Sequence, residues 1–292
     1  MQLNHNILGI IYKLLNCFCF AVMSIIIAEH LAHVPPQQLL FLRAIVSTIL
    51  CFFIAQILCL KLKLPRTSKQ IKLYLWRALI NLAAMATWVE GLKRMHINDA
   101  TALAYLGPVW VMLVAQVIFA EKLNKRHVLI VSLNLLAVFA ILQPRWLHLD
   151  YLGLCLVLVS TALWVAYEVI CKKQAVSNEH YILQALFNFM LCAVLMIPFI
   201  TLLPWQTLTL NDYSFVIIFS ALGILNVVVL FLAYVYAPLT VLAPFSYSRL
   251  LFTVMFSFIF YNTLPSYGCL LGAAIIISTN IYTARIESAL QK

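Results

Sequence analysis

Charged side chains are scarce in this sequence, since only 10% of its 292 residues are Asp, Glu, Lys or Arg and only nine are acidic. The three aspartates, Asp99, Asp150 and Asp212, stand far apart, and the seven histidines are scattered. Clustered carboxylates for a metal, or a His and acid pair, are therefore missing, which argues against a membrane-embedded enzyme. The chain also has no GxxxxGK[ST] phosphate loop and no CxxC pair among its eight cysteines. We therefore predict no metal, no cofactor and no direct use of ATP.

Apolar residues make up most of the chain. They account for 65% of it, with a mean hydropathy of +1.01, whereas soluble domains are about 45 to 50% apolar. The apolar runs are about 20 residues long, which suits helices that cross a lipid bilayer. We predict an all-α membrane protein with ten transmembrane helices, at 7–29, 37–60, 72–92, 98–119, 127–143, 151–171, 180–203, 213–237, 239–261 and 266–284.

The formal charge of +10 is distributed by loop and not as a surface patch, so we predict no nucleic-acid partner. Twelve lysines and arginines fall on one side of a ten-helix chain, in the loops at 61–72, 122–126 and 172–173 and after the last helix. Only Lys93, Arg94 and Arg145 fall on the other side. The positive-inside rule then predicts a multi-pass protein of the cell inner membrane with both termini in the cytoplasm.

The helix layout repeats after about 141 residues. The segment beginning at Ala100 aligns without gaps with the segment beginning at Val241, although only five aligned positions are identical. We predict two units of five helices, 7–145 and 150–285. Because five is odd, the second unit enters the membrane upside down. Inverted repeats with a binding site near their interface are the architecture of secondary transporters.

Several motifs resemble those of the EamA-type drug/metabolite transporter superfamily. They include "FLRA" at 41–44, the stretch from "LYLWRALINL" to "VIFAEKL" in the first unit, and "APFSYSRL" followed by "LLGAAIIIS" in the second. Within the first unit, the family's pattern matches Arg77, Ala100, Ala102, Pro108 and Glu121. The similarity is greatest to a bacterial branch described as S-adenosylmethionine-uptake-like. The resemblance covers nearly the whole chain and implies a transporter.

Arg249 lies ten residues inside the predicted helix 239–261, where its charge is hardest to expose to water. We predict Glu168 at a similar depth as its acidic partner, with Glu168 alternatively acting in ion coupling or simply neutralising nearby cations. Arg43 is expected either to reach the outer surface or to line a vestibule. Lys13 and Arg77 lie nearer the cytoplasmic ends, and we expect their side chains to extend to the surface.

Polar and aromatic residues recur at helical spacing beside these charges. Such stripes serve packing more often than ligand binding, but four of them at one depth favour a substrate cavity. Pro108 and Pro244 are expected to kink their helices there. The candidate site residues are Arg249, Glu168, Tyr247, Tyr105, Trp88, Trp164, Tyr167, Asn81 and Arg43.

We therefore expect a secondary transporter of a small polar or zwitterionic metabolite, similar to S-adenosylmethionine or an amino acid. Aromatic walls would bind its cationic part, and Arg249 its carboxylate or phosphate. The alternatives are an exporter of drugs or metabolites on the same fold and a membrane-embedded lipid-transferring enzyme. Gly268 and Gly272 form a GxxxG motif, which allows close helix contact within the protein or in a homo-oligomer through the last helix.

Overall fold

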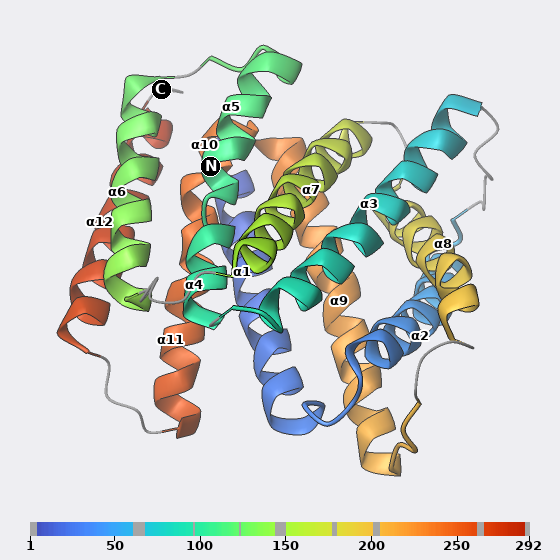
Figure 1. The fold of residues 1–292 in the computed structure, drawn as a ribbon. Helices are drawn as coiled ribbons and strands as arrows, with labels where there is room; N and C mark the ends of the chain where they lie inside the picture. Colours follow the sequence, from blue (N-terminus) through green and yellow to red (C-terminus); the bar gives the residue numbers. More distant parts are fainter. Residues whose placement is uncertain are drawn as a thin grey trace.

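Helices form every regular element in the described part of the chain (Figure 1). The computed structural model describes residues 5–60, 68–95, 97–122, 124–143, 150–176, 180–200, 205–261 and 266–289. The α-helices are α1 (His5–His30), α2 (Pro36–Ile57), α3 (Ser68–Leu92), α4 (Ile97–Ala104), α5 (Gly107–Phe119), α6 (Lys125–Leu142), α7 (Tyr151–Ala175), α8 (Tyr181–Ile200), α9 (Leu210–Tyr236), α10 (Leu239–Leu242), α11 (Ser248–Tyr261) and α12 (Tyr267–Ala289), and a 3₁₀ turn, η1 (Pro244–Tyr247), separates α10 from α11.

The predicted ten-helix membrane protein is confirmed. Within the described residues, nine segments are long and apolar enough to cross a membrane, and two of these are pairs of shorter helices: α4 with α5, and α10 with α11. Helix α3 is the tenth long helix, and it is less apolar because it carries Lys69, Lys72, Arg77 and Glu90. The chain is an integral, multi-pass membrane protein.

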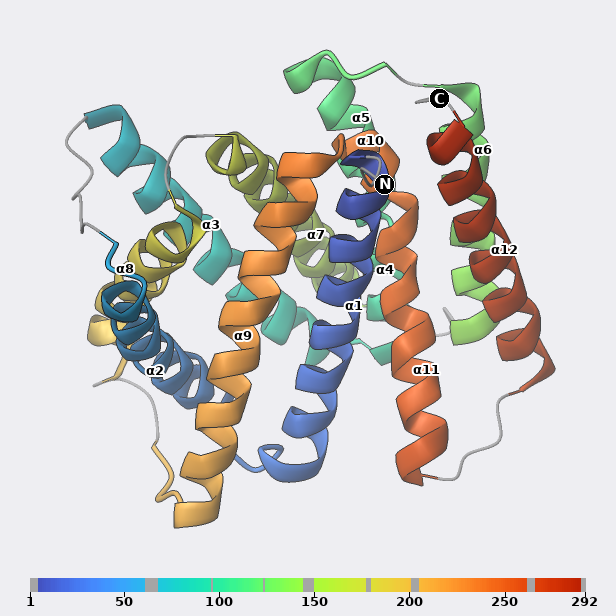
Figure 2. The ribbon, with the colours of Figure 1, turned by 180° about the vertical axis from the view of Figure 1, so that it is seen from behind.

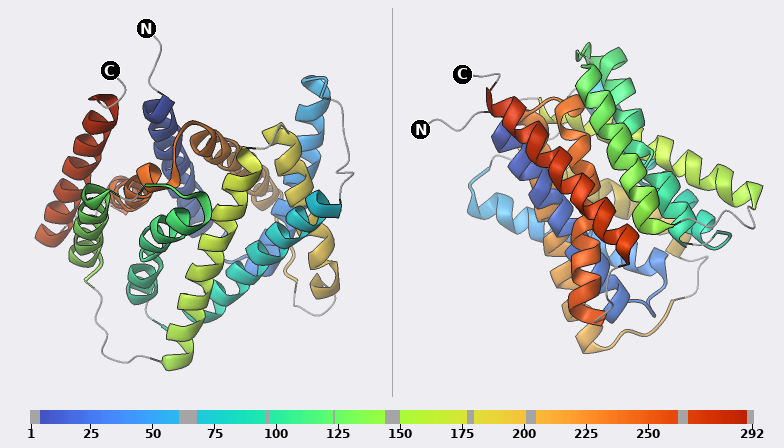
Figure 3. Two further views of the ribbon diagram at one scale, coloured as in Figure 1. Left: turned by 90° about the horizontal axis from the view of Figure 1, so that it is seen from above. Right: turned by 90° about the vertical axis from the view of Figure 1, so that its left-hand side faces the viewer.

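The helices pack in pairs, and each pair contains one helix from the first half of the chain and one from the second half. Helix α1 packs along α9, and its counterpart α7 packs along α3 (Figure 2). Helix α2 packs against α8, and α6 packs against α12, which run side by side at one edge of the molecule (Figure 3). The amino and carboxyl termini lie at the same end of the bundle, as an even number of crossings requires (Figure 1).

Two of the three isolated aspartates, Asp150 and Asp212, stabilise the starts of helices. Asp150 caps α7 by accepting hydrogen bonds from the backbone N–H groups of Leu152 and Gly153. Thr209 and Asp212 form a capping box at the start of α9, in which each side chain accepts a hydrogen bond from the other residue's backbone N–H. These caps satisfy amides that have no partner in the first helical turn, and the short polar residues therefore set where the helices begin.

Gly268 and Gly272 of the GxxxG motif face α6 of the same chain. A Cβ atom added at Gly272 would lie 2.6 Å from the carbonyl oxygen of Ala137, and one at Gly268 would lie 2.6 Å from that of Ala140. Only glycine allows this backbone approach. The motif thus serves contact within the chain, and self-association through α12, which stays a prediction, would use another face of the helix.

Candidate substrate site

The two interrupted helices contact each other at their interruptions. Helix α4 ends at Ala104 and α5 begins at Gly107, just before Pro108. The second interruption lies at Pro244, which opens η1. A proline cannot donate a backbone hydrogen bond and clashes with the preceding turn, so a break at these positions is expected. At the junction, the rings of Tyr105 and Tyr247 stack with centroids 5.8 Å apart, and the Tyr247 hydroxyl donates to the Tyr105 carbonyl at 3.2 Å.

Side chains from neighbouring helices satisfy the carbonyls at the second interruption. The thiol of Cys17 on α1 donates to the Phe245 carbonyl at 3.5 Å, and the Asn134 amide on α6 donates to the Pro244 carbonyl at 3.4 Å. Irregular backbone at membrane depth is tolerated only where protein or water supplies such partners. Side chains of other helices therefore stabilise the interruption.

Arg249 follows this interruption directly and is half-buried. Its guanidinium carbon lies 3.8 Å from the ring centroid of Phe20, and its Nε has no hydrogen-bond partner among the described residues. Glu168 does not pair with it directly, contrary to expectation. The Glu168 carboxylate instead lies 3.9 Å from the ammonium nitrogen of Lys13.

Helix α1 contributes site residues that the sequence analysis missed. Lys13, Cys17 and Phe20 recur at intervals of four and three, so they lie on one face of the helix. The expectation that Lys13 extends to the surface is wrong, because only 1% of this residue is exposed. Cys17 lies one turn from Lys13 and one turn from Phe20, whose ring contacts Arg249. The spacing of three and four was the signal in the sequence that could have identified this face.

Arg77 is also fully buried, and the expectation that it extends to the surface is wrong as well. Its guanidinium donates to the Gln174 side-chain oxygen at 2.8 Å and to the Tyr167 hydroxyl at 3.2 Å, and it packs 4.7 Å from the ring centroid of Phe231. Trp164 contacts Tyr167 edge to face, with ring centroids 5.5 Å apart. The stripe predicted on α7 thus faces a buried cation.

Arg43, Asn81 and Trp88 extend this polar region toward α2 and α3. The Arg43 guanidinium carbon lies 5.0 Å from the Phe219 ring centroid and 5.8 Å from that of Phe189, and its Nε has no hydrogen-bond partner among the described residues. Asn81 donates to the Cys192 sulfur at 3.8 Å. Trp88 is half-buried and lies seven residues beyond Asn81, about 10 Å along α3.

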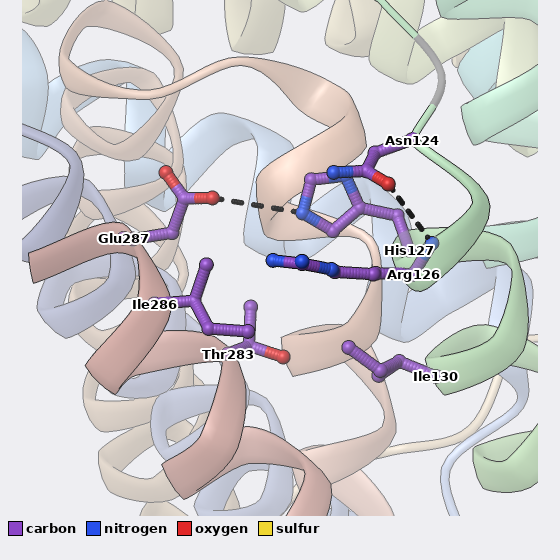
Figure 4. Close-up of a pocket in the computed structure, with 7 residues that line it drawn as sticks. All are labelled: Asn124, Arg126, His127, Ile130, Thr283, Ile286 and Glu287. Carbon is purple, nitrogen blue, oxygen red and sulfur yellow. Dashed lines mark hydrogen bonds and ion pairs between the residues drawn. The ribbon is translucent and has the colours of Figure 1, made fainter. Parts of the chain in front are cut away.

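Two open spaces lie away from these residues. A cavity of about 40 Å³ opens near the ends of α6 and α12, where Glu287 points toward His127 with 3.6 Å between its Oε1 and the histidine Nε2 (Figure 4). An apolar groove of about 340 Å³ separates α5 from α7 beside Trp110. Neither space is lined by Arg249 or Glu168.

No group of three or more His, Cys, Asp or Glu side chains could hold a metal ion within the portion of the chain that the structure describes. The polar residues at the junction are instead one carboxylate, several cations and aromatic rings. Such groups bind charged organic solutes by ion pairing and stacking.

Interrupted helices that meet beside buried charges are typical of membrane transport proteins. The chain belongs to the EamA-like transporter family, whose model matches residues 7–143 and again residues 151–283. Like its named relatives, it is a transporter and not an enzyme.

Relatives of this chain differ in what they carry. The pseudopaline exporter CntI of Pseudomonas aeruginosa is 21% identical over 96% of both chains. The S-adenosylmethionine uptake transporter of Rickettsia bellii is 23% identical over 72% of this chain and 71% of its own length. A riboflavin transporter of Brucella anthropi is 25% identical over 74% and 77%. A solved crystal structure matches with a TM-score of 0.79 at 17% identity, covering 96% of this chain and 98% of that one, which supports the fold.

Proposed function

We propose that this chain is a secondary transporter of the inner membrane, with both termini in the cytoplasm, that moves a small polar or zwitterionic, amino-acid-like metabolite by alternating access. The observation that carries this proposal is the guanidinium of Arg249 at the helix interruption. It rests on the Phe20 ring and has no carboxylate partner among the described residues. A carboxylate or phosphate of the substrate would complete it with a charge-assisted hydrogen bond.

The aromatic residues at the junction suit the remaining part of such a substrate. Tyr105 and Tyr247 stack where the repeats meet, and Trp164 with Tyr167 lies on the neighbouring helix α7. Each aromatic face contributes about 0.5 to 2 kcal/mol when it contacts a cation. An ammonium or sulfonium group of the substrate would therefore form cation–π contacts with these rings and an ion pair with Glu168.

The ion pair between Lys13 and Glu168 provides a means of coupling. Its charged atoms are 3.9 Å apart, which is longer than a hydrogen bond, and the Glu168 side chain is 24% exposed. A zwitterionic substrate would replace each half of this pair with its own opposite charge. Acids buried in membrane proteins often act in proton relays, and Glu168 is positioned to exchange a proton once Lys13 is engaged elsewhere.

The named relatives support a metabolite as the substrate, but they include both an exporter and an uptake transporter. Alternating access around one central site serves both directions, because the gradients of substrate and coupling ion determine net flow. The distribution of Lys and Arg among the loops supports cytoplasmic termini.

Counterflow in proteoliposomes tests this function. Vesicles holding the purified protein are preloaded with amino acids, S-adenosylmethionine or nucleosides, and exchange of the labelled solute is measured. We expect at least one zwitterionic metabolite to stimulate exchange, and Arg249→Ala to abolish it. Arg285→Ala, at an exposed arginine on α12, is the matched control and should exchange normally. Failure of every solute under every ion gradient would refute the proposal.

A further inference from the structure

Five Asp, Glu, Lys or Arg side chains lie in the interior of the described transmembrane helices; we call them the mid-helix charges. Each is at least seven residues, about 10 Å, from both ends of the segment that carries it, where α10 to α11 count as one segment. They are Lys13, Arg43, Arg77, Glu168 and Arg249. Every other Asp, Glu, Lys or Arg of the described helices lies closer to a helix end. Four cations thus face a single carboxylate.

The four cations form two pairs. Lys13 and Phe20, whose ring contacts Arg249, lie on one face of α1, two turns apart. Arg43 and Arg77 form the second pair, because the next residue after each, Ala44 or Ala78, packs in one buried cluster with Cys192 of α8.

Tyr167 and Glu168 are adjacent on α7, and each of them lies next to a cation of a different pair. The Tyr167 hydroxyl accepts a hydrogen bond from Arg77, and the Glu168 carboxylate lies 3.9 Å from Lys13. One stretch of α7 therefore contacts a cation of each pair. The two pairs lie around one central region of the bundle and not at opposite membrane surfaces.

Neutral groups hold the second pair. Arg77 is fully buried and contacts an amide oxygen, a phenol and aromatic rings, while the half-buried Arg43 packs against two phenylalanine rings. Neither arginine has an ion-pair partner among the described residues, and the Nε of each lacks a hydrogen-bond partner there. Burying a cation without a counter-charge is costly, and proteins normally pair such groups. The missing negative charge is the feature that requires an explanation.

We infer that the transported substrate carries two acidic groups, such as two carboxylates, one bound by Lys13 and Arg249 and the other by Arg43 and Arg77. This inference rests on the proposed function and narrows its substrate class from any zwitterion to a diacid, with or without an amino group. Arginine presents a planar fork that binds a carboxylate through two parallel hydrogen bonds, so the unsatisfied guanidinium nitrogens suit such a ligand. A diacid leaves the region much closer to neutral, whereas a solute of net positive charge adds to the excess.

Matched pairs of solutes test this inference on the purified full-length protein. L-glutamate and L-glutamine, L-aspartate and L-asparagine, and succinate and succinamate differ only in one acid replaced by an amide. Each is titrated at constant ionic strength while the midpoint of thermal unfolding is followed, and inhibition of counterflow is measured in parallel. We expect at least one diacid to bind at least tenfold more tightly than its amide partner.

Variants of the second pair locate the effect. Arg77→Gln and Arg43→Gln should each remove the preference for the diacid, whereas Arg77→Lys, which keeps the charge, should retain part of it. Arg285→Gln is the control and should behave as wild type. Size-exclusion profiles identify any variant that fails to fold. If a glutamine variant does not fold, Arg77→Lys still tests whether the preference for the diacid changes at this position.

The possible outcomes distinguish failure of the diacid assignment from failure of the proposed transport function. If counterflow proceeds with a zwitterion of one carboxylate, and no diacid exceeds its amide, the transporter stands and the diacid assignment is wrong. A preference that survives in both glutamine variants also overturns the assignment of Arg43 and Arg77. If no solute of any class is exchanged or bound, both the proposed transport function and the diacid substrate class are refuted.

Discussion

Glu121 fixes the turn through which the chain enters its second interrupted helix. Its carboxylate follows α5 in the first repeat and accepts hydrogen bonds from the backbone N–H groups of Leu239 at 3.0 Å and Thr240 at 2.8 Å, at the start of α10. Lys172 donates to the Tyr234 and Ala237 carbonyls at the end of α9, on the other side of the same turn. The acid binds the beginning of one helix and the lysine binds the end of another, as helix dipoles favour.

Glu121→Ala leaves two buried amides without acceptors, since Leu239 and Thr240 are 1% and 3% exposed. A buried N–H group that loses its partner costs about 1 to 3 kcal/mol, so for two such groups we expect the variant to lose about 2 to 6 kcal/mol of unfolding free energy. Glu121→Gln keeps one acceptor oxygen and should lose about half as much.

The measurement is SDS-induced unfolding in mixed micelles, followed by tryptophan fluorescence. Glu90→Ala serves as the control, because Glu90 is an exposed acid that contacts Lys93 and Arg94 at 3.1 and 3.3 Å. Exposed ion pairs contribute little, so this control should unfold as wild type does. Equal midpoints for Glu121→Ala and Glu90→Ala would refute the role assigned to Glu121.

Two further predictions concern packing. Gly272→Leu should lower the unfolding free energy by about 1 to 3 kcal/mol, because a Cβ there meets the Ala137 carbonyl at 2.6 Å, whereas Gly107→Ala, whose nearest neighbour would be 3.7 Å away, should leave the thermal midpoint unchanged. Tyr247→Phe removes the hydrogen bond to the Tyr105 carbonyl but keeps the stacked ring, so it should cost about 1 kcal/mol and less than Tyr247→Leu in the same SDS titration.

Hydropathy and chain length were sufficient to predict the ten helices, because an apolar run of about 20 residues has few alternatives to a membrane-crossing helix. The interruptions were expected at Pro108 and Pro244 because a proline removes a backbone hydrogen bond wherever it occurs. The η1 turn could not be predicted, since its conformation depends on partners such as Cys17 and Asn134 that lie far away in the sequence.

The position of a charge along its helix could be predicted, but its neighbours could not. Arg249 and Glu168 were placed at similar depth from their distances to the helix ends, whereas the rotation of each helix about its axis decides which side chains meet. That rotation depends on close packing along the whole helix. In the structure it brings Lys13 to Glu168 and leaves Arg249 on Phe20. The general tendency of long cations to reach the membrane surface misled the interpretation of Lys13 and Arg77 for the same reason.

The two cations beside Cys17 should respond to neutralisation with opposite sign. Arg249→Met removes a partly buried charge that has no ion-pair partner among the described residues, and the thioether can keep the contact with Phe20. We expect its unfolding free energy to stay constant or rise by about 1 kcal/mol, although exchange is lost. Lys13→Met leaves Glu168 without its counter-charge and should lower stability by about 1 to 3 kcal/mol, because the carboxylate is only partly exposed. Both midpoints come from the SDS titration. If Arg249 held the helices together, Arg249→Met would destabilise as much as Lys13→Met. A stable but inactive Arg249→Met variant would mean that the guanidinium is retained for the solute.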